Sequence, residues 1–196
     1  MAEPGPNARP SAAVILAGGT GSRMGGRDKP ALVLGKRTLL QIAVDAVGGG
    51  PTVVVGAARE LPSHVRSVIE DPPGGGPAAA VVAGLAALPE LDPDALIALL
   101  ASDLPGVDRD TMIRLCAAAG QGGAVLIDAA GRRQYLTGVW RLSLLQSAVD
   151  LRPDWTGRPL RELLAPIPVR QVAGSAAETA DVDTEQDWRR WRQDLP

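Results

Sequence analysis

A glycine-rich stretch near the start of the chain carries cationic side chains, two of which, Arg23 and Lys29, suit phosphate binding. Residues 17–30 have the sequence AGGTGSRMGGRDKP, which contains five glycines together with Arg23 and Lys29. Successive backbone amides can form a concave anion site. Arg23 can grip phosphate oxygens with two parallel hydrogen bonds, and Lys29 supplies a mobile point charge. The stretch predicts a triphosphate-binding loop, although a surface loop with solvated charges would have a similar composition.

Two common phosphate-binding patterns do not fit this stretch. In the dinucleotide pattern G-x-G-x-x-G, started from Gly19 and Gly21, the last glycine is replaced by Met24. The P-loop pattern needs Ser or Thr after Gly-Lys, but Lys36 is followed by Arg37. The sequence therefore argues against both a nicotinamide dehydrogenase and a P-loop NTPase.

Asp103 is the leading candidate for a metal-binding carboxylate. It ends the apolar run ALIALLASD, so it is expected at the carboxyl edge of a strand, where α/β sheets bind their ligands. Mg²⁺ usually takes one or two protein carboxylates and completes its shell with water and substrate phosphates. The sequence SDLPG is equally typical of a turn, in which Asp103 would have only a local role. The residue pattern alone leaves both interpretations open.

A second carboxylate is available in the segment ADVDTEQDW, just before the last predicted helix. Asp183, with Asp181 nearby, would complete a Mg²⁺ site if this segment lies beside Asp103. Thr184 and Asp187 have the spacing of a helix capping box. Asp183 can therefore also be a polar residue just outside a helix start.

Charge and composition argue against several classes of partner. The 196 residues carry a formal net charge of −2 and 3% aromatic residues, which disfavours nucleic acid as a partner. No apolar run reaches the roughly 18 residues of a membrane span. With one cysteine, Cys116, the chain has no internal disulfide, and with one histidine, His64, a His-rich zinc site is excluded. The opening residues lack a signal-peptide run, so we expect a cytoplasmic protein with neither nucleic acid nor membrane as partner.

Short apolar runs alternate with helical patterns along the chain, as in βαβ units with a mostly parallel sheet. We expect strands at 12–17, 52–56, 67–69, 95–101, 124–128, 135–140 and 168–172. We expect helices at 38–47, 77–88, 109–119, 143–151, 159–164 and 184–193. The sequence predicts an α/β fold, a three-layer sandwich around one mostly parallel sheet. A single domain would span 12–196, after a flexible tail at 1–11.

The segment LAGGTGSRMGGRDKPALVLGKRTLL resembles the signature of nucleotidyltransferases that move NMP from an NTP onto a phosphate-bearing acceptor. Within that superfamily it is most similar to the molybdenum cofactor guanylyltransferases, with Leu-Ala-Gly-Gly, Arg-Met-Gly-Gly and Asp-Lys at similar gaps. The resemblance covers essentially the whole chain after the tail and implies a Rossmann-like nucleotidyltransferase fold. It implies transfer of GMP from GTP to the terminal phosphate of (molybdenum-)molybdopterin, with Mg²⁺ as cofactor and release of pyrophosphate. It also implies transient contact with molybdenum-insertion proteins or acceptor molybdoenzymes.

The same resemblance assigns roles to individual residues. Arg23, Lys29 and Asp103 would be catalytic, and Asp103 with Asp183 would hold Mg²⁺. Asp71, which follows a short predicted strand, would accept hydrogen bonds from N1–H and the exocyclic amine of guanine, although turn chemistry also explains it. The full set expected at the nucleotide is Leu16, Ala17, Gly18, Gly19, Gly21, Arg23, Lys29, Asp71 and Asp103.

The chain departs from the family pattern at several positions near the nucleotide. Asp181 and Asp183 stand where the family has two asparagines, and Gly56 stands where it commonly has another. Because Asp-x-Asp-Thr is similar to cytidylyl-transferring relatives, CTP stays open beside GTP. The same residues are compatible with transfer to a sugar or alditol phosphate, and with a non-catalytic nucleotide-binding regulatory module. On the acceptor side, Trp140 or Arg141 is a candidate pterin contact, although core packing of Trp140 and solvation of Arg141 are the favoured explanations of each residue.

Overall fold

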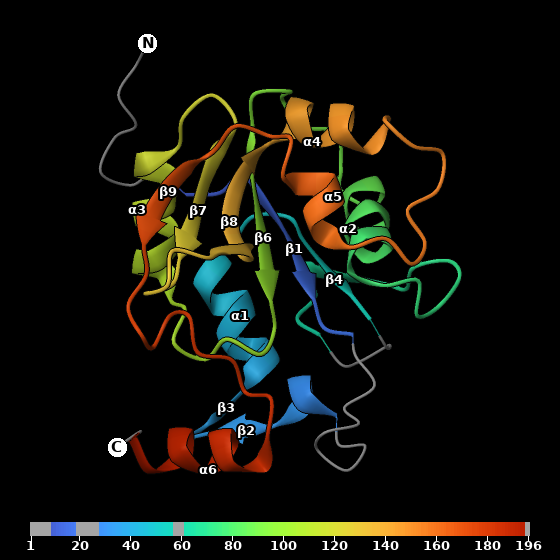
Figure 1. Cartoon of the computed structure of the whole chain (residues 1–196). Helices are drawn as coiled ribbons and strands as arrows, with labels where there is room; N and C mark the ends of the chain where they lie inside the picture. Colours follow the sequence, from blue (N-terminus) through green and yellow to red (C-terminus); the bar gives the residue numbers. More distant parts are fainter. Residues whose placement is uncertain (1–8, 19–27, 57–60, 195–196) are drawn as a thin grey trace.

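The first strand lies in the middle of a mostly parallel sheet. The computed structural model describes residues 9–18, 28–56 and 61–194. Within them, seven strands form one sheet in the order β5-β4-β1-β6-β8-β7-β9 (Figure 1). β8 pairs antiparallel with β6 and β7, and the other pairings are parallel. The bounds are β1 Ala12–Leu16, β4 Thr52–Val55, β5 Val65–Val68, β6 Leu96–Ala101, β7 Gly123–Ile127, β8 Arg133–Arg141 and β9 Arg170–Ala173.

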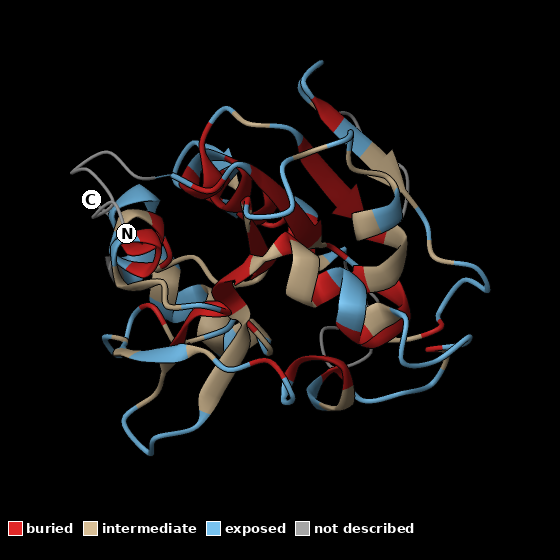
Figure 2. Cartoon of the chain, turned by 90° about the horizontal axis from the view of Figure 1, so that it is seen from above, coloured by how far each residue is buried: buried red, intermediate tan, exposed pale blue. Residues whose placement is uncertain are grey.

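Helices cover both faces of this sheet and complete the expected three-layer sandwich (Figure 1). On one face lie α1 (Leu39–Val47) and α3 (Arg109–Ala118), and on the other lie α2 (Pro77–Ala86), α4 (Leu142–Val149) and α5 (Leu160–Leu164). Successive side chains of a strand point to opposite faces. Val14 therefore packs with the α2 side, while Ile15 packs with the α1 side. Figure 2 shows this buried interior running through the sheet and the inner helix surfaces.

A smaller apolar cluster joins the end of the chain to the segment after the glycine-rich loop. A 3₁₀ turn, η2 (Lys29–Ala31), leads into the short hairpin of β2 (Val33–Leu34) and β3 (Arg37–Thr38). Trp188 and Trp191 of α6 (Glu185–Asp194) pack against the cluster formed by Leu32, Leu34, Leu39, Ile42 and Val182. Figure 1 shows α6 beside this hairpin. The packing brings the segment before α6 close to Lys29.

Local sequence signals explain why the main elements form. Thr38 caps α1 in a capping box with Gln41, and Asp108 does the same for α3 with Thr111. β4 is a run of Thr-Val-Val-Val buried along its whole length, as expected for a strand covered on both faces. Each of the seven expected strands and six expected helices is present, with ends that differ by a few residues.

Two features of the fold differ from the prediction. The β2–β3 hairpin has strands of two residues, too short to show periodicity. β8 is longer than expected and antiparallel. At the start of the chain, residues 1–8 of the expected tail lie outside the described residues, while Pro10 is buried and the Ser11 amide donates to the Leu96 carbonyl at 2.8 Å.

The strand order reverses at the ends of β1 and β6, where open α/β sheets form a crevice for their ligands. From β1 the chain proceeds outward to β4 and β5, and it then returns to β6 on the other side of β1. Ligands of open α/β sheets bind outside the carboxyl ends of the strands at such a reversal. No helix in the described part of the chain is both long enough and apolar enough to cross a membrane.

Candidate functional site

Three of the expected site residues meet at the carboxyl ends of β1 and β6. The Lys29 ammonium lies 2.5 Å from Asp183 Oδ1 and 3.9 Å from Asp103 Oδ2. Lys29 comes from η2, Asp103 from the turn after β6, and Asp183 from the segment before α6. Their side chains are partly exposed, at 19%, 28% and 37% respectively. The predicted proximity of these residues is confirmed, and a ligand in the crevice can reach them.

Backbone hydrogen bonds fix the two carboxylate-bearing segments. The Ser102 amide donates to the Leu16 carbonyl at 3.0 Å, which ties the end of β6 to the end of β1. The Val182 amide donates to the Asp103 carbonyl at 2.9 Å. The chain before α6 is therefore attached directly to the residue that follows β6, so Asp103 and Asp183 hold a defined relative position.

The described part of the site has an excess of negative charge. Burial raises the pKa of Asp103 above its ordinary value; the Lys29 charge lowers it, and the neighbouring Asp181 and Asp183 charges raise it again. One ammonium thus lies among three carboxylates. A divalent cation would relieve their mutual repulsion, and two carboxylates suit Mg²⁺, which takes its remaining ligands from water and phosphate. In the described residues, no group of three or more His, Cys, Asp or Glu side chains is arranged to hold a metal ion.

The start of the glycine-rich loop lies at the same crevice. Leu16 ends β1, Ala17 is buried, and Gly18 is exposed. The Ala17 amide donates to the Val55 carbonyl at 2.8 Å, so the chain stays attached to β4 as it leaves the sheet. The other expected loop residues, Gly19, Gly21 and Arg23, lie outside the described residues, and their phosphate-binding roles stay predictions.

Close contact with the start of this loop explains why residue 56 is a glycine. Its φ is +147°, and a Cβ at this position would lie 2.8 Å from the carbonyl carbon and oxygen of Ala17. A side chain would therefore meet backbone, which cannot move without disturbing β1. In the sequence Gly56 is only a departure from the family's asparagine, and the structure supplies the steric reason for glycine.

Gly56→Ala is expected to lower the free energy of unfolding by roughly 1–3 kcal/mol, because the strained φ and the contact with Ala17 add to each other. Urea denaturation measures the change. Gly49→Ala is the matched control, since Gly49 is exposed and a Cβ there has nothing within 4 Å. Equal stabilities for the two variants would contradict the steric explanation.

Asp71 follows β5 at the same edge of the sheet and is exposed. β5 is separated from β1 by β4, so Asp71 lies on the far side of β1 from Asp103. Recognition of the base by Asp71 stays a prediction.

Asp103 also lines a cavity of about 600 Å³. Asp181 and residues 132–137 at the start of β8 are further parts of its lining. Asp128 holds the β7–β8 turn in place by accepting from the Arg132 amide at 2.9 Å and from Arg132 Nε at 2.8 Å. Sequence patterns do not predict this cavity, because its lining comes from a turn and a strand start without a motif.

Trp140 and Arg141 do not line this cavity. Trp140 is fully buried and stacks with Tyr135 at 6.3 Å between ring centroids, so core packing is confirmed as its role. The Arg141 guanidinium donates to the carbonyls of Gly120, Gln121 and Asp94. Simple solvation does not describe Arg141, because it joins two loops, and its role as a pterin contact stays a prediction.

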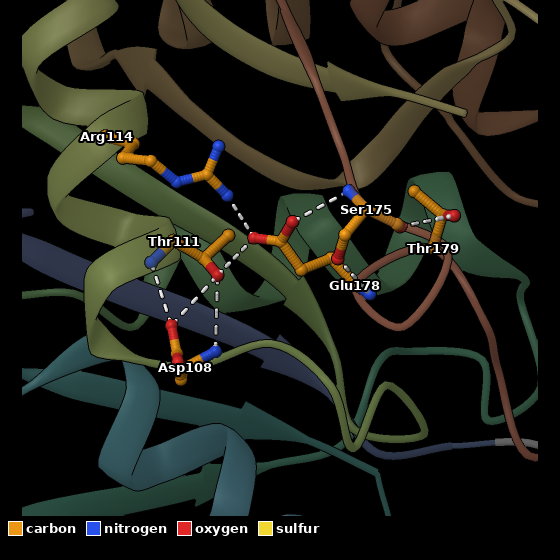
Figure 3. A network of polar contacts seen from close by, with 6 residues as sticks. All are labelled: Asp108, Thr111, Arg114, Ser175, Glu178 and Thr179. Atoms are coloured by element: carbon orange, nitrogen blue, oxygen red, sulfur yellow. Dashed lines mark hydrogen bonds and ion pairs between the residues drawn. The ribbon is translucent and has the colours of Figure 1, made fainter. Parts of the chain in front are cut away.

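The segment between β9 and α6 is anchored through Glu178, a residue without any signal in the sequence. The Glu178 side chain is 11% exposed. Its carboxylate accepts from Thr111 Oγ1 at 2.6 Å, from the Ser175 amide at 2.8 Å and from the Arg114 guanidinium (Figure 3). Thr111 also forms the capping box of α3 with Asp108. These contacts join an irregular loop to the first turns of a helix.

Glu178 should make stability depend on pH. Burial raises its pKa, but hydrogen bonds from Thr111 and Ser175 and the Arg114 charge outweigh burial, so the pKa lies below its ordinary 4.5. A depressed folded-state pKa gives stability that is present above the unfolded-state pKa and lost as pH falls through the folded-state pKa. Relative to wild type, Glu178→Gln is expected to lose about 1–3 kcal/mol near neutrality, and the difference should shrink below pH 4.5.

Denaturant titrations at several pH values measure that difference. The control is Glu90→Gln, at an exposed residue, which should change stability little at any pH. A Glu178→Gln deficit that persists unchanged in acid would show that the carboxylate charge is not what stabilises the loop.

The capping box expected at the last helix is present beside Asp183. Thr184 Oγ1 accepts from the Asp187 amide at 3.2 Å, and Asp187 Oδ2 accepts from the Thr184 amide at 2.9 Å. Asp183 precedes this cap and also pairs with Lys29. The two interpretations of this segment are therefore compatible, since Thr184 and Asp187 cap the helix while the Asp183 carboxylate pairs with Lys29.

Comparison with known proteins identifies a family and relatives with similar sequences. The family model described as MobA-like NTP transferase domain matches residues 13–173. The molybdenum cofactor guanylyltransferase of Rhodopseudomonas palustris is 35% identical over 149 residues, covering 71% of this chain and 68% of that protein.

Two solved structures share the fold. A nucleotidyl transferase from Methanothermobacter superposes with a TM-score of 0.70 at 26% identity, covering 93% of this chain and 95% of the other. The molybdopterin-guanine dinucleotide biosynthesis protein A of Archaeoglobus fulgidus has a TM-score of 0.63 at 17% identity, covering 93% and 94%. The expected Rossmann-like nucleotidyltransferase fold is thereby confirmed. With a matching family model over most of its length and a relative at 35% identity, the chain belongs to the MobA-like NTP transferase family.

Proposed function

We propose that the protein transfers GMP from GTP to the terminal phosphate of molybdopterin, with or without molybdenum, and releases pyrophosphate. The observation that carries the proposal is the cluster of Lys29, Asp103 and Asp183 at the ends of β1 and β6, where Asp103 also lines a cavity. A transferase needs two substrate sites that meet at the reacting phosphorus. Asp103 would lie between the nucleotide and an acceptor in that cavity, and similarity to guanylyltransferases supports the choice of substrates.

The triphosphate would lie at the start of the glycine-rich loop. Backbone amides after Gly18 and the Arg23 guanidinium would bind the β- and γ-phosphates, and Lys29 would neutralise charge on the α-phosphate. Asp103 and Asp183 would hold Mg²⁺, which when bound offsets the negative charge that accumulates on the transferring phosphate. Asp71 would accept from the guanine edge. Leu16 and Ala17 would contact the nucleoside with their backbone.

The chemistry needs no general base. A terminal oxygen of the pterin phosphate attacks the α-phosphorus of GTP in line, a new P–O bond forms, and the bond to the pyrophosphate oxygen breaks. The attacking phosphate is already ionised near neutral pH, in keeping with an absence of histidine from the described cluster. Asp103 and Asp183 are therefore assigned to metal binding and not to proton transfer.

The Lys29–Asp183 pair implies an exchange of partners when substrates bind. At 2.5 Å the two charges neutralise each other, so neither is fully available to a ligand. Entry of the nucleotide phosphates would draw Lys29 away and leave Asp183 to the metal. We infer that metal and nucleotide bind cooperatively. The nucleotide phosphates would pair with the Lys29 ammonium, and the metal would pair with the Asp183 carboxylate that Lys29 leaves.

The cavity beside Asp103 would hold the acceptor. Its volume of about 600 Å³ falls in the range of small-molecule sites. Arg132 and Arg133 at its wall could pair with the acceptor phosphate. The buried Cys116 suits a reducing compartment, and we propose a cytoplasmic setting with transient contacts to molybdenum-insertion proteins or acceptor molybdoenzymes.

A pyrophosphate-release assay tests the proposal. Purified protein with Mg²⁺ is supplied with each of the four NTPs, with and without molybdopterin. We expect release only when molybdopterin is present, and fastest with GTP. Preference for CTP would assign the Asp181–Asp183 departure to cytidylyl transfer, and release with a sugar or alditol phosphate alone would replace the acceptor. Tight nucleotide binding without any release would favour a regulatory module.

A further inference from the structure

The second carboxylate of the site is carried by irregular chain. Residues 174–184, between β9 and α6, contain neither helix nor strand, yet they supply Asp183 to the cluster and Asp181 to the cavity wall. A metal ligand must be held within a fraction of an ångström to be effective. Such precision requires the loop to be anchored by contacts outside itself.

Three contacts anchor this loop to the segment that follows β6. The Val182 amide donates to the Asp103 carbonyl. Gly106 lies so close to Ala177 that a Cβ at Gly106 would collide with the Ala177 carbonyl oxygen. Between these two points in the loop stands Glu178, which is bonded to Thr111 and Arg114 of α3 (Figure 3).

Among these contacts, the hydrogen bonds of the Glu178 carboxylate are expected to be the strongest. Hydrogen bonds to a charged group are roughly twice as strong as neutral ones. The side chain is 11% exposed, so losing a partner would leave a buried group uncompensated, at a higher cost than losing a solvated contact. Because Thr111 is fixed in the capping box of α3, Glu178 transmits the position of that helix to the loop.

We propose that Glu178 is a positioning residue for the metal site, holding Asp181 and Asp183 against Asp103 through Thr111 and Arg114. Glu178 itself contacts neither substrate nor metal, and its effect on metal binding rests on the proposed function. Partners that orient metal ligands typically contribute 10- to 100-fold in metal affinity or activity. We expect an effect of about that size when the Glu178 contacts are lost.

Two readouts on the full-length protein separate anchoring from general stability. The first is hydrogen exchange of the Val182 amide, compared with that of Leu99 in the middle of β6. The second is binding of Mn²⁺, followed by electron paramagnetic resonance of the free ion. Glu178→Gln keeps the shape of the side chain and removes its charge, and Thr111→Val offers a milder loss if Glu178→Gln fails to fold. Leu145→Ala, in the buried core of α4, is the control for loss of stability alone.

We expect Glu178→Gln to speed Val182 exchange at least about 10-fold with little change at Leu99, and to weaken Mn²⁺ binding about 10- to 100-fold. Leu145→Ala should leave Mn²⁺ affinity as in wild type. The proposal is overturned if folded Glu178→Gln matches wild type in both readouts, or if Leu145→Ala weakens Mn²⁺ binding equally. If the wild type binds no Mn²⁺ but Glu178→Gln still speeds Val182 exchange, the anchoring role of Glu178 is supported. The metal role of Asp183 in the proposed function is then overturned.

Discussion

Lys29→Met is expected to reduce nucleotidyl transfer about 100- to 1000-fold, by analogy with the loss of one preorganised charge contact to a transition state. Lys29 is the described cation nearest both carboxylates, at 2.5 Å from Asp183 and 3.9 Å from Asp103. Without it, charge on the transferring phosphate is less well neutralised. Steady-state pyrophosphate release measures the loss, which should fall mainly on kcat.

The control for this change is Lys36→Met, which removes the same charge from an exposed position in the β2–β3 hairpin. Both variants should fold, since the Lys29 ammonium is partly solvated. In the substrate-free protein Lys29→Met should also bind Mn²⁺ more tightly, because Asp183 loses a cation that competes with the metal. A folded Lys29→Met variant with near-normal turnover would refute the role of this ammonium.

Asp103→Asn is expected to lower turnover by a similar factor of about 100 to 1000. Asp103 follows β6 and lines the cavity proposed for the acceptor, so its carboxylate would serve both substrates. An amide oxygen keeps the shape but is a weaker ligand for Mg²⁺ than a carboxylate. The loss should be largest at low Mg²⁺ and partly recovered at high Mg²⁺, as pyrophosphate assays over a range of concentrations would show.

Asp183→Asn is an informative companion to this change. It restores the residue type that the family pattern has at this place, and it should therefore cost much less than Asp103→Asn. Asp45 of α1 forms an exposed ion pair with Arg37, so Asp45→Asn serves as the neutral control. Equal losses of turnover in Asp103→Asn and Asp45→Asn would contradict the assignment of Asp103 to the metal site.

Much of the fold could be predicted because local signals agree with it. The strands of the parallel part are short continuous apolar runs such as Val53-Val54-Val55, and the helices begin at recognisable caps such as Thr38 and Asp108. Such patterns need only neighbouring residues to be interpreted. The hairpin of β2 and β3 could not be predicted because two-residue strands carry no periodicity.

Candidate site residues that stand next to a strand end or a helix cap could be predicted from the sequence. Residues whose position depends on tertiary contacts could not. Lys29, Asp103 and Asp183 can be named from the sequence, since each stands next to a strong motif or a helix cap. Glu178 cannot, because two of its partners, Thr111 and Arg114, are more than sixty positions away in the chain. The hydrogen bonds of Arg141 could not be predicted for the same reason: its carbonyl partners come from loops that only the fold brings together.

The most direct measurement is a crystal structure of the protein with GTP and Mg²⁺. The triphosphate is predicted at the end of β1, between Gly18 and Lys29, with Mg²⁺ bound by Asp103 and Asp183 and the Lys29 ammonium moved from Asp183 to phosphate. A polyphosphate bound away from the end of β1, with Asp103 facing elsewhere and the Lys29–Asp183 pair intact, would contradict the proposed site.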